Sequence, residues 1–136
     1  MTSTPDSSVL VPALAQWHPQ HENARVAVRA ASLVIAHVVI ETFSVLTRLP
    51  APHRISVTDA AEAVSGLPWT PVGLPADEQA QLVSHAGRLS IGGGAVYDGL
   101  IAAAARHHGL TVLTRDRRSR RTYELIGADY RFVPDL

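Results

Sequence analysis

The sequence predicts an α/β fold in which helices cover a mainly parallel sheet, and three observations carry this prediction. Short β-branched runs alternate with helical segments along the whole chain, as in βαβ units. Residues 33–36 and 110–114 are rich in β-branched and apolar side chains, which is typical of parallel strands buried on both faces. The 136 residues, of which 46% are apolar and 18% charged, suit a single core. We therefore expect one domain over residues 1–136.

In the first half of the chain, prolines and capping residues delimit the expected elements. Asp6 stands at the start of the first helix, and Pro12 falls near its first turn, where proline is tolerated. Pro50 and Pro52 stop a later helix, and Ser56 is a candidate cap for the next one. The expected elements are helices over residues 7–16, 20–30, 38–49 and 56–67 and strands over residues 33–36 and 69–72.

In the second half of the chain, glycines and acidic residues in first helical turns delimit the expected elements. Asp77 and Glu78 lie in the first turn of a helix that begins at Pro75. Gly109 and Gly127 each end a helix. The expected elements are that helix, a glycine hinge over residues 92–94, helices over residues 95–108 and 119–126, and strands over residues 110–114 and 130–133.

The composition excludes several classes of function. The chain has no cysteine, which excludes disulfide scaffolds, thiolate zinc sites and cysteine nucleophiles. All twelve cations are arginine, so the phosphate-loop lysine and Schiff-base chemistry are excluded as well. The apolar runs are too short to cross a bilayer, and the start of the chain lacks the features of a signal peptide. We expect a cytoplasmic protein without a membrane partner.

Four carboxylates stand where expected strands give way to helices: Asp6, Glu41, Asp98 and Asp116. In an open α/β sheet such positions gather along one edge, where ligands bind. Each acid alone is explained by a helix cap or a surface charge, but four together would repel one another unless cations neutralise them. Hard oxygen ligands suit Mg²⁺ or Mn²⁺. The sequence therefore predicts a metal site at this edge.

Small side chains surround one of these acids. Ala95, Ala102 and Ala105 share a helix face with Asp98. That face either leaves room for a substrate or packs closely against the sheet, and the sequence leaves both readings open.

Two strings of the C-terminal half, YDGLIAAAA at residues 97–105 and HGLTVLTRD at residues 108–116, resemble the signature of PIN-domain ribonucleases. Within that family the chain is most similar to VapC-type toxins of bacterial toxin–antitoxin pairs. The opening DSSVLV from Asp6 matches the family's first motif, and Glu41 falls where its second acid is expected. The likeness extends from Asp6 to Val133. One departure is the polar segment before Asp6, which contains Pro5 where the family has an apolar strand, so either strand one is short and irregular or the start is unusual.

The resemblance implies a PIN-like α/β/α sandwich that cuts RNA with Mg²⁺ or Mn²⁺. It implies Asp6 and Asp98 as direct metal ligands and Glu41 and Asp116 as ligands through water. Thr114 would form a hydrogen bond within the cluster. The resemblance further implies a small antitoxin as partner and a homodimer.

Five arginines surround the last acid: Arg115, Arg117, Arg118, Arg120 and Arg121. They are expected either to clamp RNA phosphates or to form a solvated face with its own salt bridges. The formal net charge of zero does not exclude RNA. If cations neutralise the four clustered carboxylates, twelve arginines face eight remaining acids.

Two other functions compete with the nuclease. One is a PIN-like binding or assembly module without catalysis, which would gain nothing from four clustered acids. The other is a phosphorylation-receiving domain, which needs a lysine on a late strand that this chain does not have.

Overall fold

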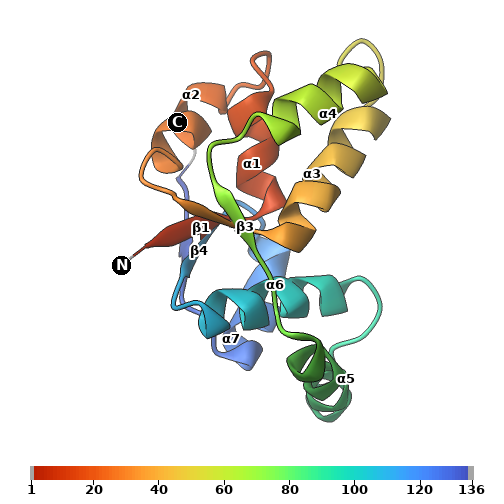
Figure 1. The fold of residues 1–136 in the computed structure, drawn as a ribbon, viewed down its shortest axis with the longest axis vertical. Helices are drawn as coiled ribbons and strands as arrows, with labels where there is room; N and C mark the ends of the chain where they lie inside the picture. The colour runs from red at the N-terminus through yellow and green to blue at the C-terminus, as the bar shows by residue number, and fades with distance from the viewer. Residues whose placement is uncertain (1, 135–136) are drawn as a thin grey trace.

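The computed structural model describes residues 2–134, and its helices and strands alternate as the sequence predicts (Figure 1). In chain order they are β1 Ser3–Pro5, α1 Ser7–Leu14, α2 His21–Ala27, β2 Leu33–Ile35, α3 Ala36–Arg48, α4 Val57–Ser65, β3 Thr70–Val72, α5 Ala76–Leu89, α6 Ala95–His107, β4 Thr111–Thr114, the 3₁₀ turn η1 Arg117–Ser119, α7 Arg120–Ile126 and β5 Tyr130–Phe132. Within this part of the chain, no helix is long and apolar enough to cross a membrane.

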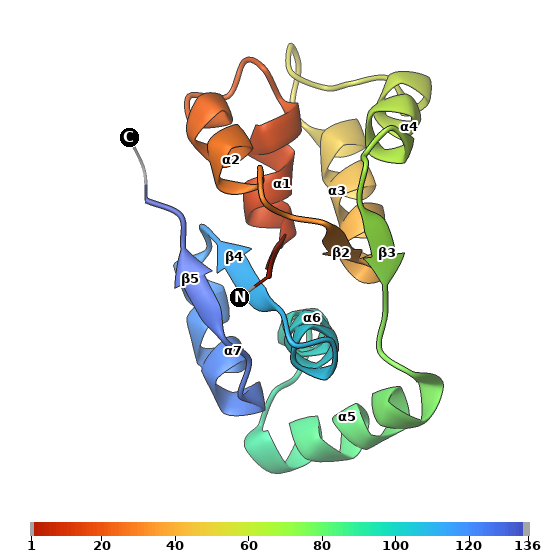
Figure 2. The same cartoon turned by 60° about the vertical axis from the view of Figure 1, so that its left-hand side comes forward.

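All the strand pairs are parallel. One sheet has the order β1-β4-β5, and β2 pairs with β3 in a second. The two sheets meet where β1 lies beside β2, and there the Thr4 hydroxyl donates to the Leu33 carbonyl at 3.0 Å. In both ribbon views, α1 to α4 lie on one side of the strands and α5 to α7 on the other (Figures 1 and 2). This arrangement confirms the predicted α/β class with a mainly parallel sheet.

The polar start of the chain forms the strand β1 at the end of the three-stranded sheet, in spite of Pro5. The Thr111 N–H donates to the Thr2 carbonyl and the Asp6 N–H to the Leu113 carbonyl, both at 2.9 Å. Backbone groups of alternate residues point to the same side of a strand, so Pro5 directs its missing donor away from β4. The β4 ladder therefore loses no hydrogen bond, and the short first strand of the family pattern is present.

Some predicted boundaries are wrong. The helix expected over residues 20–30 ends at Ala27, after which the N–H groups of Arg29 and Ala31 donate to the carbonyls three residues back instead of four. The helix expected from Ser119 begins one residue later, as α7 at Arg120, and follows η1, which Asp116 caps. Gly127 ends α7 at φ +86°, a conformation that glycine adopts without strain.

The alanine face of α6 packs into the core. Ala102 and Ala105 are fully buried among residues such as Leu10, Val34 and Val112. Of the two readings that the sequence left open, close helix–sheet packing is the one observed. The small side chains bring α6 near the sheet and so place Asp98 beside the strand ends.

Candidate metal centre

Each of the four predicted acids lies where a strand gives way to a helix or within the first two turns of one. Asp6 follows β1 and caps α1, and Asp116 follows β4 and caps η1. Glu41 is in the second turn of α3, directly after β2, and Asp98 is in the first turn of α6. The negative charges of Glu41, Asp116 and Asp6 all act on Asp98. The four acids therefore gather at one edge, as the sequence predicts.

Asp6 is the most enclosed of the four, with 3% of its surface exposed. Its Oδ1 accepts from the backbone N–H of Ser8 at 3.0 Å and from the Ser8 hydroxyl at 2.5 Å, and its Oδ2 accepts from the Tyr123 hydroxyl at 2.7 Å. Burial raises the pKa of Asp6, and hydrogen bonds from Ser8, Thr114 and Tyr123 oppose that rise. Asp6 is thus a desolvated carboxylate surrounded by donors.

Asp98 is half-buried and less well supported. The Ser119 hydroxyl donates to its Oδ2 at 3.3 Å. Burial, together with the charges of Glu41, Asp116 and Asp6, raises the pKa of Asp98 to about 6. A carboxylate with that pKa lies in a negative potential that a cation would relieve.

Glu41 is held by two neighbouring side chains. The Ser7 hydroxyl donates to its Oε1, and His37 Nε2 lies 3.3 Å from its Oε2. The His37 ring stacks on Tyr97, with ring centres 5.2 Å apart and planes 4° from parallel. This stack joins α3 to α6 beside the carboxylates.

Thr114 and Ser8 connect Asp116 to Asp6. The Asp116 N–H donates to Thr114 Oγ1 at 3.1 Å, and Thr114 Oγ1 lies 3.3 Å from Ser8 Oγ. The Arg115 N–H donates to Ser8 Oγ at 2.7 Å. These bonds fix the turn after β4 against the start of α1.

Three arginines of the cluster make contacts within the protein. Arg118 Nε lies 3.3 Å from Asp116 Oδ1, and Arg120 Nε lies 3.0 Å from Glu124 Oε1. The Arg117 guanidinium lies over the Phe132 ring, 4.5 Å from its centre. These contacts agree with a face that has its own salt bridges, while the exposed side chains remain accessible to a phosphate.

Sequence reasoning missed five residues that contact the acids: Ser7, Ser8, His37, Ser119 and Tyr123. The spacing along the sequence could have indicated two of them. Asp116, Ser119 and Tyr123 are separated by three and four residues, so in a helix they share a face. His37 and Glu41, four residues apart on α3, follow the same rule.

The donor set fits a divalent cation. In residues 2–134, no three His, Asp or Glu side chains already close on a single point. Mg²⁺ does not need such a cage, because it keeps several waters and is held by one or two carboxylates together with substrate phosphates. The hard oxygen donors and the raised pKa of Asp98 are the observations that support the fit.

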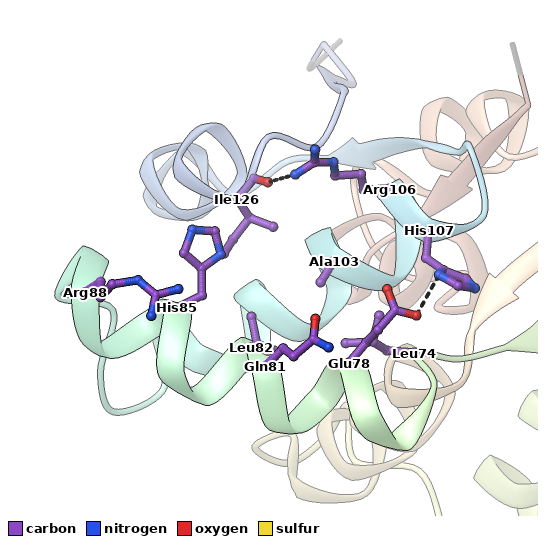
Figure 3. A pocket seen from close by; sticks show the side chains of 10 residues that line it. All are labelled: Leu74, Glu78, Gln81, Leu82, His85, Arg88, Ala103, Arg106, His107 and Ile126. Carbon is purple, nitrogen blue, oxygen red and sulfur yellow. Dashed lines mark hydrogen bonds and ion pairs between the residues drawn. The ribbon is translucent and has the colours of Figure 1, made fainter.

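Two clefts lie in different parts of the surface. One of about 370 Å³ borders the acidic edge and is lined by residues that include Ser7, Ser8 and Asp116. Another of about 470 Å³ lies between α5, α6 and the end of α7, where Arg106 donates to the Ile126 carbonyl (Figure 3). None of the four acids lines this second cleft, whereas Asp116 lines the first.

A parallel sheet with clustered carboxylates at its carboxyl edge defines an α/β protein suited to holding divalent cations. The chain belongs to the PIN domain family, whose profile matches residues 4–125.

Two curated relatives from Mycobacterium tuberculosis are similar to nearly the whole chain. Ribonuclease VapC40 is 38% identical over 130 residues, which cover 95% of this chain and 97% of the relative. Ribonuclease VapC27 is 40% identical over 124 residues, or 90% of each chain.

Two solved structures share the fold. VapC20 of Mycobacterium tuberculosis, described as a sarcin-ricin loop cleaving toxin, has a TM-score of 0.69 at 17% identity, covering 88% of this chain and 94% of VapC20. FitAcB from Neisseria gonorrhoeae has a TM-score of 0.65 at 21% identity, covering 95% of this chain and 96% of that one.

Proposed function

We propose that the protein is a divalent-metal-dependent endoribonuclease and the toxin of a toxin–antitoxin pair. The observation that carries the proposal is the set of four carboxylates at one sheet edge, where burial and like charge raise the pKa of Asp98 to about 6. Two relatives that match nearly the whole chain are named ribonucleases. An inactive binding module gains no stability from such a cluster and is the disfavoured alternative.

The four acids take different parts in this mechanism. Asp6 and Asp98 hold Mg²⁺ or Mn²⁺ directly, and Glu41 and Asp116 hold it through water. The metal, when bound, supplies an activated water and stabilises charge on the attacked phosphate and the leaving oxygen. Thr114 fixes the backbone of Asp116 and so sets the position of that carboxylate.

The exposed arginines of the cluster contact the RNA backbone. Arg117, Arg118, Arg120 and Arg121 are exposed and Arg115 is partly buried at the cleft beside Asp116. Guanidinium groups bind phosphate oxygens through paired donors.

The protein works in the cytoplasm as a homodimer that a small antitoxin neutralises. Exposed apolar side chains support a protein partner: Ile40 is 70% exposed, Val83 68% and Tyr97 54%. They lie on α3, α5 and α6, and Ile40 and Tyr97 directly precede Glu41 and Asp98 in the chain.

The test is RNA cleavage by purified protein in Mg²⁺, in Mn²⁺ and in EDTA, with the cleavage ends mapped. Asp6→Asn and Asp98→Asn should each lower the rate by at least about 100-fold, because each removes a metal-binding charge. The matched control is Asp77→Asn, an exposed acid on α5. Undiminished cleavage by both site variants, or cleavage that persists in EDTA, would sink the proposal.

A further inference from the structure

One short segment contains one of the four carboxylates and contacts two of the other three. It begins at Asp116, continues through η1 and forms the first turn of α7. From it, the Ser119 hydroxyl reaches Asp98 at 3.3 Å and the Tyr123 hydroxyl reaches Asp6 at 2.7 Å. Ser119 is 2% exposed and Tyr123 is fully buried, so both hydroxyls lie inside the protein.

The bonds of Asp6 leave little of its carboxylate for a cation. A carboxylate has about four acceptor directions. Ser8 occupies two of them on Oδ1, with its N–H and its hydroxyl, Tyr123 occupies one on Oδ2, and the Thr114 hydroxyl also acts on the carboxylate. At most one direction is left, on Oδ2, so Asp6 cannot chelate a cation through both oxygens while these bonds persist.

Tyr123 is suited to keep this arrangement fixed. Its ring belongs to the main core cluster and lies 6.1 Å from the ring of Tyr130, so the hydroxyl is held by packing. The hydroxyl lies 2.7 Å from Asp6 Oδ2, and because a phenol ordinarily keeps its proton at neutral pH, it donates to that oxygen. Ser8 lies two residues from Asp6 along the chain, whereas Tyr123 is 117 residues away and ties α7 to the start of α1.

We propose that Tyr123 is a positioning residue, which holds the Asp6 carboxylate so that it binds the divalent cation through one oxygen, Oδ2. This inference rests on the proposed function, since it concerns the same metal site. Outer partners of metal ligands orient those ligands, and their loss typically weakens metal affinity or activity about 10- to 100-fold.

The experiment compares Tyr123→Phe with Tyr130→Phe. Each removes one phenolic hydroxyl, but that of Tyr130 bonds to the exposed Glu124 at 2.5 Å. Calorimetric titration with Mn²⁺ should give a Kd about 10-fold or more higher for Tyr123→Phe and unchanged for Tyr130→Phe. In RNA cleavage, kcat should fall for Tyr123→Phe while KM stays the same, since the hydroxyl does not contact RNA.

A measurement on the unmutated Tyr123 covers the case in which Tyr123→Phe does not fold. The chain has three tyrosines. In a Tyr97→Phe, Tyr130→Phe double variant labelled with ¹³C at the tyrosine ζ carbon, the one remaining signal belongs to Tyr123. Saturating Mg²⁺ should shift this signal, because the oxygen that accepts from Tyr123 is the oxygen that binds the cation.

The outcomes separate this inference from the proposed function. A folded Tyr123→Phe protein with an unchanged Mn²⁺ Kd, or a Tyr123 signal that Mg²⁺ does not move, overturns the positioning role. A protein that binds Mn²⁺ but cuts no RNA refutes the nuclease, while the Mn²⁺ Kd of Tyr123→Phe still decides the role of Tyr123.

Discussion

Asp6 and Asp98 are the same chemical group in two different environments. Asp6 is 3% exposed, and its hydrogen bonds to Ser8 and Tyr123 are 3.0 Å or shorter. Asp98 is half-buried, with a single 3.3 Å bond from Ser119 and three like charges acting on it. The fold itself therefore stabilises the position of Asp6, whereas the charge of Asp98 is left for a cation to neutralise. One half of the site is preorganised and the other half is stabilised by what it binds.

The first prediction, which has the largest expected effect, is that replacing Asp6 and replacing Asp98 change the free energy of unfolding by different amounts. Asp6→Asn places an amide NH₂ against donors from Ser8 or Tyr123, so one buried donor is left without an acceptor. The free energy of unfolding should therefore fall by about 1–3 kcal/mol. Asp98→Asn removes a charge from a negative environment, so it should change the free energy of unfolding by less than about 0.5 kcal/mol or increase it.

Urea unfolding of both variants in EDTA measures this difference. Asp77→Asn, an exposed substitution on α5, is the control for the loss of a carboxylate as such. Equal losses for Asp6→Asn and Asp98→Asn would show that the fold does not distinguish the two halves.

The second prediction concerns pH and follows from the raised pKa of Asp98, about 6 against an ordinary value of 3.8. Ionisation is less favourable in the folded state, so the contribution of Asp98 to the stability of the metal-free protein falls as pH rises from about 4 to about 6. Metal binding has the opposite dependence, because protons compete with the cation for the carboxylate. The Mn²⁺ affinity should rise up to about tenfold per pH unit below pH 6 and level off above it.

Mn²⁺ titrations between pH 5 and pH 8 test this dependence, with Asp98→Asn as the comparison. That variant should bind more weakly, and its affinity should vary less with pH near 6. A wild-type affinity that is constant across this range would contradict the assignment of Asp98 as a ligand.

The features that could be predicted from the sequence are the local ones. Residues 33–36 and 110–114 combine apolar side chains with β-branching, so the strands at β2 and β4 follow from composition alone. The acids are recognisable because each follows such a strand or begins a helix. The family motifs around Asp98 and Asp116 add the expected activity and the roles of the acids, which the pattern of strands and helices does not establish by itself.

The features that could not be predicted depend on contacts between distant segments. The sequence left the first strand in doubt because Ser3–Pro5 is polar and contains proline, and only its parallel pairing with β4 makes it a strand. Tyr123 lies 117 residues from Asp6, and its side chain is indistinguishable from an ordinary core aromatic until the two are brought together. Whether the alanine face of α6 was open or packed also depended on how near the sheet lies.

The smallest expected effect is at the basic rim, on the side of the site that binds substrate. Arg121 is exposed, and Arg120 beside it is paired with Glu124 at 3.0 Å. If Arg121 contacts a phosphate, Arg121→Gln should raise KM about 3- to 10-fold and leave kcat unchanged. The slope of log KM against log salt concentration should also fall by about 0.7, which is the value for one phosphate contact with a single strand. The control is Arg48→Gln, an exposed arginine in the last turn of α3. If both variants shift KM equally, the effect belongs to net charge and not to a clamp beside Asp116.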